Sequence, residues 1–141
     1  MSNAEDHSFE SLQVGGSAFF EHTIAEEELN IFAQLSGDKN PLHVDDAYAA
    51  ASSYGRKVVH GMFLGALVSR LVGMQLPGKR ALLVSESLEF KKPAHCGQKV
   101  RVEGVVVRKS VSTQMVELGF KITVEGVLIA VGEARVIVRG N

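Results

Sequence analysis

An acid and an imidazole lie five residues apart around a rigid turn. Asp38 and His43 flank the dipeptide Asn40-Pro41, and Gly37 precedes the acid. Proline fixes its own φ and keeps the preceding residue out of the α region, while glycine permits backbone angles that other residues resist. An Asp and a His held together near neutral pH can take a proton from water and return one. The segment therefore predicts a shaped loop that presents a general acid–base pair.

Simpler interpretations of this loop exist. Asp and Asn often form Asx-type turns, in which case His43 would be an ordinary hydrogen-bonding residue. Asp-x-Asn also begins an EF-hand calcium loop, but that loop needs Gly at its sixth and Glu at its twelfth position, where this chain has His43 and Ala49. The remaining candidate ligands show neither His-x-x-x-His nor Cys-x-x-Cys spacing. We therefore predict no metal site among His43, His60, His95 and Cys96.

The residues around this loop follow a recognisable pattern. Phe32 is followed by Ser-Gly-Asp-x-Asn-Pro-Leu-His, and a small residue, Ala49, lies six positions after the histidine. A second element, Val59-His60-Gly61-Met62, opens an apolar stretch that contains Ser69. In the order and spacing of these elements the chain resembles the MaoC-like, (R)-specific enoyl-CoA hydratases from about residue 8 to residue 138. The complete pattern favours a catalytic pair over a plain turn.

Two further site residues are expected on the apolar stretch. The N-terminus of a helix offers unpaired N–H donors and a favourable dipole, and such donors stabilise a developing enolate-like oxygen. Gly61 would supply this donor, although a glycine there could also serve close packing alone. Ser69 follows a little over two turns later and could face the same cleft, or simply bond to the carbonyl four residues back.

The resemblance implies a function and roles for these residues. Asp38 and His43 would hold one water, the Gly61 N–H would bind the thioester carbonyl, and Ser69 and Asn40 would support the pair. The implied reaction is that of a hydro-lyase: reversible addition of water to trans-2-enoyl-CoA, giving (R)-3-hydroxyacyl-CoA. This reaction needs no metal or redox cofactor, and coenzyme A is part of the substrate. The family pairs two such units, which implies a homodimer.

Three alternatives remain open. A dehydratase of (R)-3-hydroxyacyl groups on acyl carrier protein would use the same site. A hot-dog acyl-CoA thioesterase would release a free thiol, and a non-catalytic acyl-binding subunit would be expected to lose Asp38 or His43. Basic side chains could contact the phosphates of coenzyme A or be ordinary surface charges. These candidate phosphate contacts are Arg56, Lys57, Lys91 and Lys92.

Composition limits the remaining classes. The 141 residues are enough for one domain, and 45% hydrophobic with 22% charged residues is typical of globular chains. The net charge of −1, with dispersed Lys and Arg, gives no footprint for nucleic acid. One cysteine, Cys96, cannot form an internal disulfide, and the N-terminus lacks a signal-peptide pattern. We therefore expect a cytoplasmic protein.

The helices that should position the site can be read from the pattern. The first fifteen residues are polar and expected to be loosely held, and residues 18–23 read as a strand. A helix with an acidic first turn, Glu26-Glu27-Glu28, should end at Ser36-Gly37, and a short one should span residues 46–51. The buried stripe of the first of these helices should comprise Leu29, Phe32, Ala33 and Leu35.

The stretch from Gly61 to Leu76 is apolar around nearly its whole circumference. A membrane span needs ~20 apolar residues, whereas this run is shorter and contains Arg70, so we expect a buried helix of a soluble fold. Its glycines, Gly61, Gly65 and Gly73, should allow close packing against a sheet.

Everything after residue 80 reads as strands rich in Val, Ile and Phe, with a hairpin turn at Glu125-Gly126. The expected strands cover residues 82–90, 99–109, 114–123 and 127–138. One early strand, one buried helix and four later strands predict an α+β fold in which an antiparallel sheet wraps around a central helix. This is the hot-dog fold, which the resemblance also implies.

Overall fold

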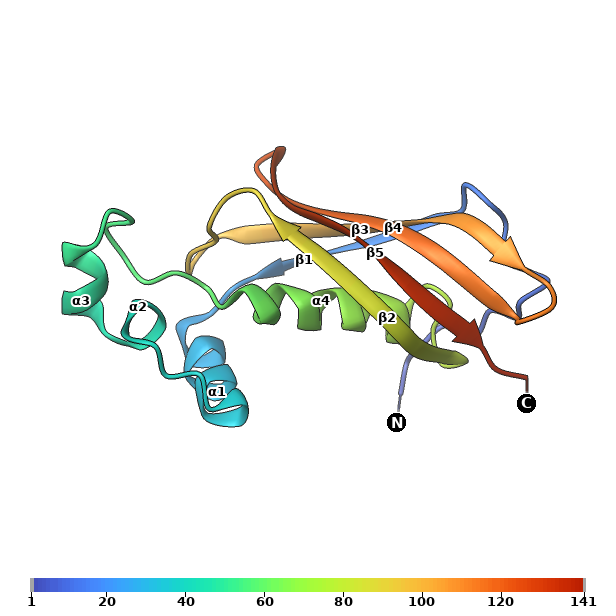
Figure 1. The fold of residues 1–141 in the computed structure, drawn as a ribbon, viewed down its shortest axis with the longest axis horizontal. Coiled ribbons are helices and arrows are strands. Elements are labelled where there is room, and N and C mark those ends of the chain that lie inside the picture. The colour runs from blue at the N-terminus through green and yellow to red at the C-terminus, as the bar shows by residue number, and fades with distance from the viewer. Residues whose placement is uncertain (1, 141) are drawn as a thin grey trace.

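A long helix, α4 (Gly61–Met74), lies in the concave face of a curved antiparallel sheet (Figure 1). The computed structural model describes residues 2–140. The sheet has five strands in the order β1-β3-β4-β5-β2. These are β1 (Ser17–Thr23), β2 (Ala81–Phe90), β3 (Lys99–Ser110), β4 (Met115–Val124) and β5 (Val127–Val138). The expected α+β arrangement and all five expected strands are confirmed.

Alternation along the central strands explains why the sheet closes on α4. In β3 the side chains of Val100, Val102 and Val106 are buried, whereas the alternating Arg101, Glu103 and Val105 are only partly buried. A matching row in β4 includes Leu118 and Ile122. Burying one such side chain contributes ~1.5–3 kcal/mol, so a sheet with one apolar face must cover it. The buried residues of α4 that fill this face are Phe63, Leu64, Leu67, Val68, Leu71 and Val72.

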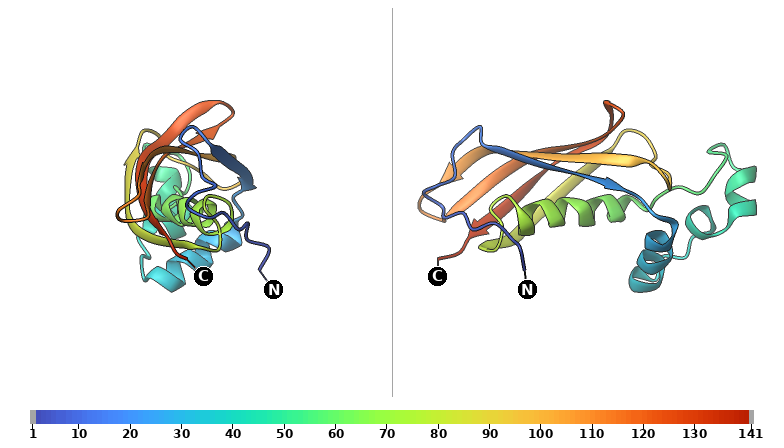
Figure 2. Two further views of the ribbon diagram at one scale, coloured as in Figure 1. Left: turned by 90° about the vertical axis from the view of Figure 1, so that its right-hand side faces the viewer. Right: turned by 180° about the vertical axis from the view of Figure 1, so that it is seen from behind.

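Three short helices stand beyond the N-terminal end of α4. They are α1 (Glu26–Ser36), α2 (Pro41–Val44) and α3 (Asp46–Ala51), and both chain ends lie at the opposite end of the molecule (Figures 1 and 2). The single-turn helix α2 was not expected. None of the helices within residues 2–140 is long and apolar enough to cross a bilayer.

The hairpin between β4 and β5 follows the predicted turn. Glu125 and Gly126 have φ values of 50° and 77°, so both occupy the left-handed region. Two successive residues of this kind form the turn whose twist matches that of antiparallel strands. The turn sets the register that pairs Val124 with Val127.

Two expectations about the N-terminal part of the chain are wrong. Residues 2–15 are not loosely held, because Phe9 and Leu12 are buried in the core and the Lys109 ammonium donates to both of their carbonyl oxygens at 2.7 Å. Leu35 is 81% exposed, so the buried stripe of α1 comprises Leu29 and Ala33 with the partly buried Phe32. Periodicity alone could not show that Leu35, close to the end of α1, is left exposed in the folded chain.

Helix α4 is not buried on all sides. Met62 is 60% exposed, and Ser69 and Arg70 also lie on its open face. The expectation about its glycines holds at two positions. A Cβ at Gly61 would come within 2.8 Å of the Phe90 ring, and one at Gly65 within 2.9 Å of Glu86, whereas one at Gly73 would meet nothing within 4 Å.

Glu86 of β2 is partly buried against α4, and within residues 2–140 it is the only carboxyl group with a buried oxygen that lacks a hydrogen-bond partner. Its Oε1 accepts no hydrogen bond there, and its Oε2 lies against Gly65. Burial raises the pKa of this carboxyl group, because the charged form is poorly solvated.

Two glycine substitutions test the closeness of packing. At Gly132 a Cβ would lie 1.8 Å from the Ser87 carbonyl oxygen, so Gly132→Ala must separate β5 from β2 and should lower the free energy of unfolding by about 3 kcal/mol. Gly73→Ala, with open space and a helical backbone, should raise it by ~0.5–1 kcal/mol. Urea unfolding of both variants measures this. Equal stabilities would contradict the packing described here.

Candidate active site

A series of local hydrogen bonds shapes the loop after α1. Gly37, at φ 79°, ends the helix and donates its N–H to the Ala33 carbonyl at 3.0 Å. The Asp38 N–H then donates to the Ser36 Oγ at 3.1 Å, and the Asn40 N–H donates to Asp38 Oδ1 at 3.2 Å. Oδ1 is thus used within the loop, which leaves Oδ2 as the carboxylate oxygen free for chemistry.

Asn40 links this loop to α2. Its side chain accepts from the Leu42 N–H at 2.9 Å and caps the helix, while Pro41 occupies the first helical position. The cap delivers His43 on the first turn that follows. Asn40 thus forms an Asx-type turn between Asp38 and His43, and its support of the pair stays a prediction.

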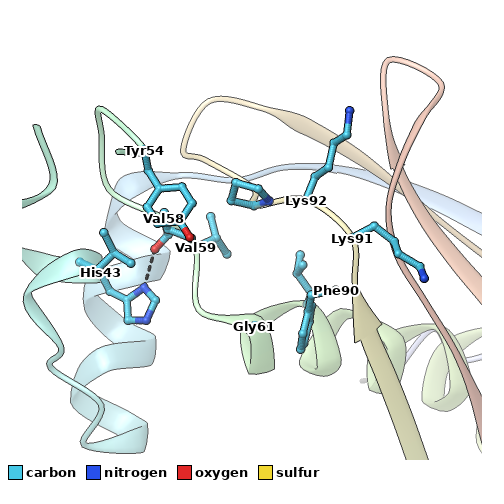
Figure 3. Close-up of a pocket in the computed structure, with 11 residues that line it drawn as sticks. His43, Tyr54, Val58, Val59, Gly61, Phe90, Lys91 and Lys92 are labelled. Carbon is cyan, nitrogen blue, oxygen red and sulfur yellow. Dashed lines mark hydrogen bonds between the residues drawn. The ribbon is translucent and has the colours of Figure 1, made fainter. Parts of the chain in front are cut away.

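His43 is held by the segment that leads into α4. Its Nδ1 lies 2.6 Å from the Val58 carbonyl oxygen (Figure 3). The Val58 N–H in turn donates to the Leu42 carbonyl at 3.0 Å. Because a carbonyl oxygen only accepts, Nδ1 carries a proton in both the neutral and the charged ring. Every proton that His43 gains or loses must therefore pass through Nε2.

The free nitrogen of His43 faces the free oxygen of Asp38. His43 Nε2 and Asp38 Oδ2 are 4.0 Å apart, with the His43 side chain 15% exposed and that of Asp38 52% exposed. This distance is too long for a direct hydrogen bond, but two bonds of ~2.8 Å to one water span roughly 4 to 4.5 Å. The predicted pair is thus brought together with room for a water between its members.

His60 adds a buried ring to this pair, for which sequence reasoning gave no role. The ring is 2% exposed and stacks on His43 at 4.0 Å between centroids, with 24° between the planes. Its Nε2 donates to the Asp38 carbonyl oxygen at 3.0 Å. Only its place in the Val-His-Gly-Met element pointed to it, because 22 residues separate it from Asp38.

Asp38, His43 and His60 together bring three ligand atoms within 4.8 Å, a cluster that sequence spacing did not reveal. The geometry does not fit a metal ion. His43 Nδ1 and His60 Nε2 already donate to carbonyl oxygens. The nitrogens left to bind an ion would therefore be Nε2 of His43 and Nδ1 of His60. An ion ~2.0–2.1 Å from both nitrogens would have to lie in both ring planes, and stacked rings do not permit that. The absence of a metal remains a prediction.

Gly61 begins α4 and opens onto the same pocket as His43. Within residues 2–140 no backbone carbonyl accepts from its N–H, which points from the positive end of the helix. The Phe90 ring lies so close that any side chain at this position would clash with it. The pocket has a volume of about 360 Å³ and mostly apolar walls. Its lining residues are Leu42, His43, Tyr54, Val58, Val59, Gly61, Leu64, Phe90, Lys91, Lys92 and Pro93 (Figure 3).

Ser69 is not brought to the acid in the single chain. It lies on the exposed face of α4, eight residues and roughly 12 Å along the helix from Gly61. In the described part of the chain no hydrogen bond joins its side chain to Asp38. The expected support of the acid by Ser69 therefore stays a prediction.

The four basic residues fall into different settings. Lys91 and Lys92 line the pocket, and Figure 3 shows both side chains extending away from His43. Lys57 instead pairs with Glu26 and Asp46, and the hydrogen bond to Glu26 is the main reason that its pKa is raised. Arg56 is exposed and does not line the pocket.

The free thiol of Cys96 is partly buried, and its burial raises the pKa, so little reactive thiolate forms.

Comparison with known proteins assigns the family. The model of the MaoC like domain matches residues 14–126. The chain belongs to this family. It is 41% identical to the (R)-specific enoyl-CoA hydratase of Aeromonas caviae, over 90% of this chain and 96% of that protein. It is 30% identical to a mitochondrial 3-hydroxyacyl-[acyl-carrier-protein] dehydratase of Arabidopsis thaliana, over 78% of this chain and 66% of that protein.

The fold agrees with this assignment. The unliganded R-hydratase PhaJ1 from Pseudomonas aeruginosa superposes with a TM-score of 0.92 at 32% identity, covering 98% of this chain and 89% of that one. The predicted hot-dog fold, a five-stranded antiparallel sheet around a helix, is confirmed.

Proposed function

We propose that this MaoC-like protein is an (R)-specific enoyl-CoA hydratase, which adds water reversibly to trans-2-enoyl-CoA to give (R)-3-hydroxyacyl-CoA. The observation that carries the proposal is the 4.0 Å separation of Asp38 Oδ2 and His43 Nε2. The Gly61 N–H opens onto the same pocket as His43. Similarity to the hydratase of Aeromonas caviae over nearly the whole chain supports the reaction class.

The chemistry follows from these positions. The Gly61 N–H donates to the thioester carbonyl, draws electron density from the double bond and makes C3 electrophilic. One member of the Asp38–His43 pair takes a proton from the bound water as its oxygen attacks C3. The other member returns a proton to C2 on the same face. The reaction uses no cofactor beyond the coenzyme A of the substrate.

The same site would serve a dehydratase of (R)-3-hydroxyacyl groups on acyl carrier protein. Similarity to the Arabidopsis thaliana dehydratase favours this as the second candidate. Kinetics with the same acyl group on both carriers separates the two. Because Asp38 and His43 are both present and face one another, the thioesterase and the non-catalytic subunit are less well supported. We also retain the proposal of a cytoplasmic location, which the free Cys96 thiol supports.

Removing either proton-handling group tests the mechanism. Asp38→Asn and His43→Ala should each lower kcat by at least ~10²–10⁴-fold while the fold survives, because general acid–base groups contribute about that much. The double variant should be scarcely slower than the slower single variant, since both groups act on one water. Steady-state hydration rates and circular dichroism provide the measurement. Near-normal turnover in either single variant contradicts the mechanism.

We propose that Lys91 and Lys92 contact the phosphates of coenzyme A at the pocket rim. Lys91 also donates to Glu89 at 2.6 Å, so Lys92 is the better test. Lys92→Gln should raise KM for an enoyl-CoA about tenfold, or ~1.4 kcal/mol. KM for the matching enoyl-pantetheine thioester, which lacks the nucleotide phosphates, should not change. An equal change in KM for both substrates would refute the contact.

We infer that two chains pair as a homodimer through the outer edge of β2. This edge strand presents Leu82, Leu83 and Val84, which are 53%, 37% and 47% exposed, and an apolar edge of this kind is a hazard in a monomer. Asp38 and His43 of one site would come from the same subunit. Sedimentation at micromolar concentration should give a dimer, and Val84→Glu should give a monomer. A monomeric wild-type protein would contradict the inference.

A further inference from the structure

His60 is a buried titratable ring that the hydration mechanism does not use. It precedes α4, its side chain is 2% exposed, and it makes no capping hydrogen bond to the helix. With Nε2 donating to the Asp38 carbonyl oxygen, the neutral ring leaves Nδ1 as an acceptor. That atom is buried and has no hydrogen-bond partner among the described residues. A purely apolar ring would fill this space without a buried, unpaired acceptor.

The hydrogen bond to Asp38 acts on the loop rather than on the carboxylate. The 3.0 Å contact joins His60 Nε2 to the backbone carbonyl of Asp38, whose own side chain is 52% exposed. The other bonds that shape the loop come from residues 33–42 of the chain itself. His60 therefore supplies a long-range link that holds the Asp38 backbone against the start of α4.

The face of the same ring contacts the other member of the pair. His60 stacks on His43 with 4.0 Å between ring centroids, and Phe32 packs against His60 with 4.9 Å between centroids. His43 is thus held in its plane by Val58 and across its face by His60. One side chain touches both halves of the acid–base pair, and each half through a different interaction.

We propose that His60 is a positioning residue that sets the separation of Asp38 Oδ2 and His43 Nε2. The expected effect on kcat rests on the proposed function, whereas the contacts of His60 with Asp38 and His43 do not depend on it. The ring donates one hydrogen bond and offers one aromatic face, and it exchanges no proton with the substrate. Displacing a reacting group by about 1 Å costs ~10²-fold in rate, so the effect should appear in kcat.

Two substitutions separate the two contacts of His60. His60→Phe keeps an aromatic ring against His43 and Phe32 but removes the N–H donor. His60→Gln places an amide N–H near the position of Nε2 but removes the ring. We expect His60→Phe to lower kcat by ~10²-fold with KM nearly unchanged, and His60→Gln to recover at least about tenfold of that loss. The melting temperature of His60→Phe should not fall, because removal of the buried unpaired acceptor offsets loss of the hydrogen bond to Asp38, an exposed residue whose carbonyl water can then solvate.

His95→Phe is the matched control. His95 is also buried, at 8% exposure, and its Nδ1 donates to the Lys57 carbonyl at 2.8 Å, in the same segment. The substitution removes a comparable hydrogen bond without touching Asp38 or His43, so kcat should be retained. If His60→Phe does not fold, the comparison is made between His60→Gln and His60→Asn, whose amide nitrogen falls near Nδ1.

The outcomes are distinguishable. Full kcat in His60→Phe, or no recovery in His60→Gln, overturns the positioning role while leaving the hydratase proposal intact. An inactive wild-type protein overturns the hydratase proposal, and the role of His60 is then decided by a crystal structure of His60→Phe. We expect the Asp38 Oδ2–His43 Nε2 separation in that structure to depart from 4.0 Å. An unchanged separation overturns the inference.

Discussion

The hydrogen bond from His43 Nδ1 to the Val58 carbonyl oxygen is the interaction on which the site depends. At 2.6 Å it fixes the proton on Nδ1 and directs Nε2 toward Asp38. The return bond from the Val58 N–H to the Leu42 carbonyl makes the contact two-sided. The helical segment that carries His43 is thereby joined to the segment that becomes α4.

That segment contributes three elements of the site within four residues. Val58 orients His43, His60 contacts both members of the pair, and Gly61 opens α4 with an N–H free to donate. The position of this segment is in turn fixed by the hydrogen bond from the Val59 N–H to the carbonyl of Ala94, in the loop after β2. Because the rest of α4 is packed into the sheet, the donor at its N-terminus is held on a rigid element, as a preorganised site requires.

Local patterns predicted much of this architecture. Alternation in β3 and the Glu125-Gly126 turn depend on neighbouring residues, and both were predictable for that reason. The Asp38 loop was equally predictable, since Gly37 and Asn40 act within a few residues of the acid.

The features that sequence reasoning missed depend on long-range contacts. The buried Phe9 is contacted by Lys109 of β3 through its carbonyl oxygen, and Lys57, in the segment before α4, pairs with Glu26 of α1. The role of His60 depends on a partner 22 residues away. No period or local motif carries such information, so these contacts became visible only in the folded chain.

The most direct test of the central claim is a reaction of the purified protein with crotonyl-CoA, in which enoyl absorbance, free thiol and product configuration are followed together. The account predicts that the enoyl signal falls, that no thiol appears, and that the product is (R)-3-hydroxybutyryl-CoA. Release of free thiol, or formation of the (S) product, would contradict it.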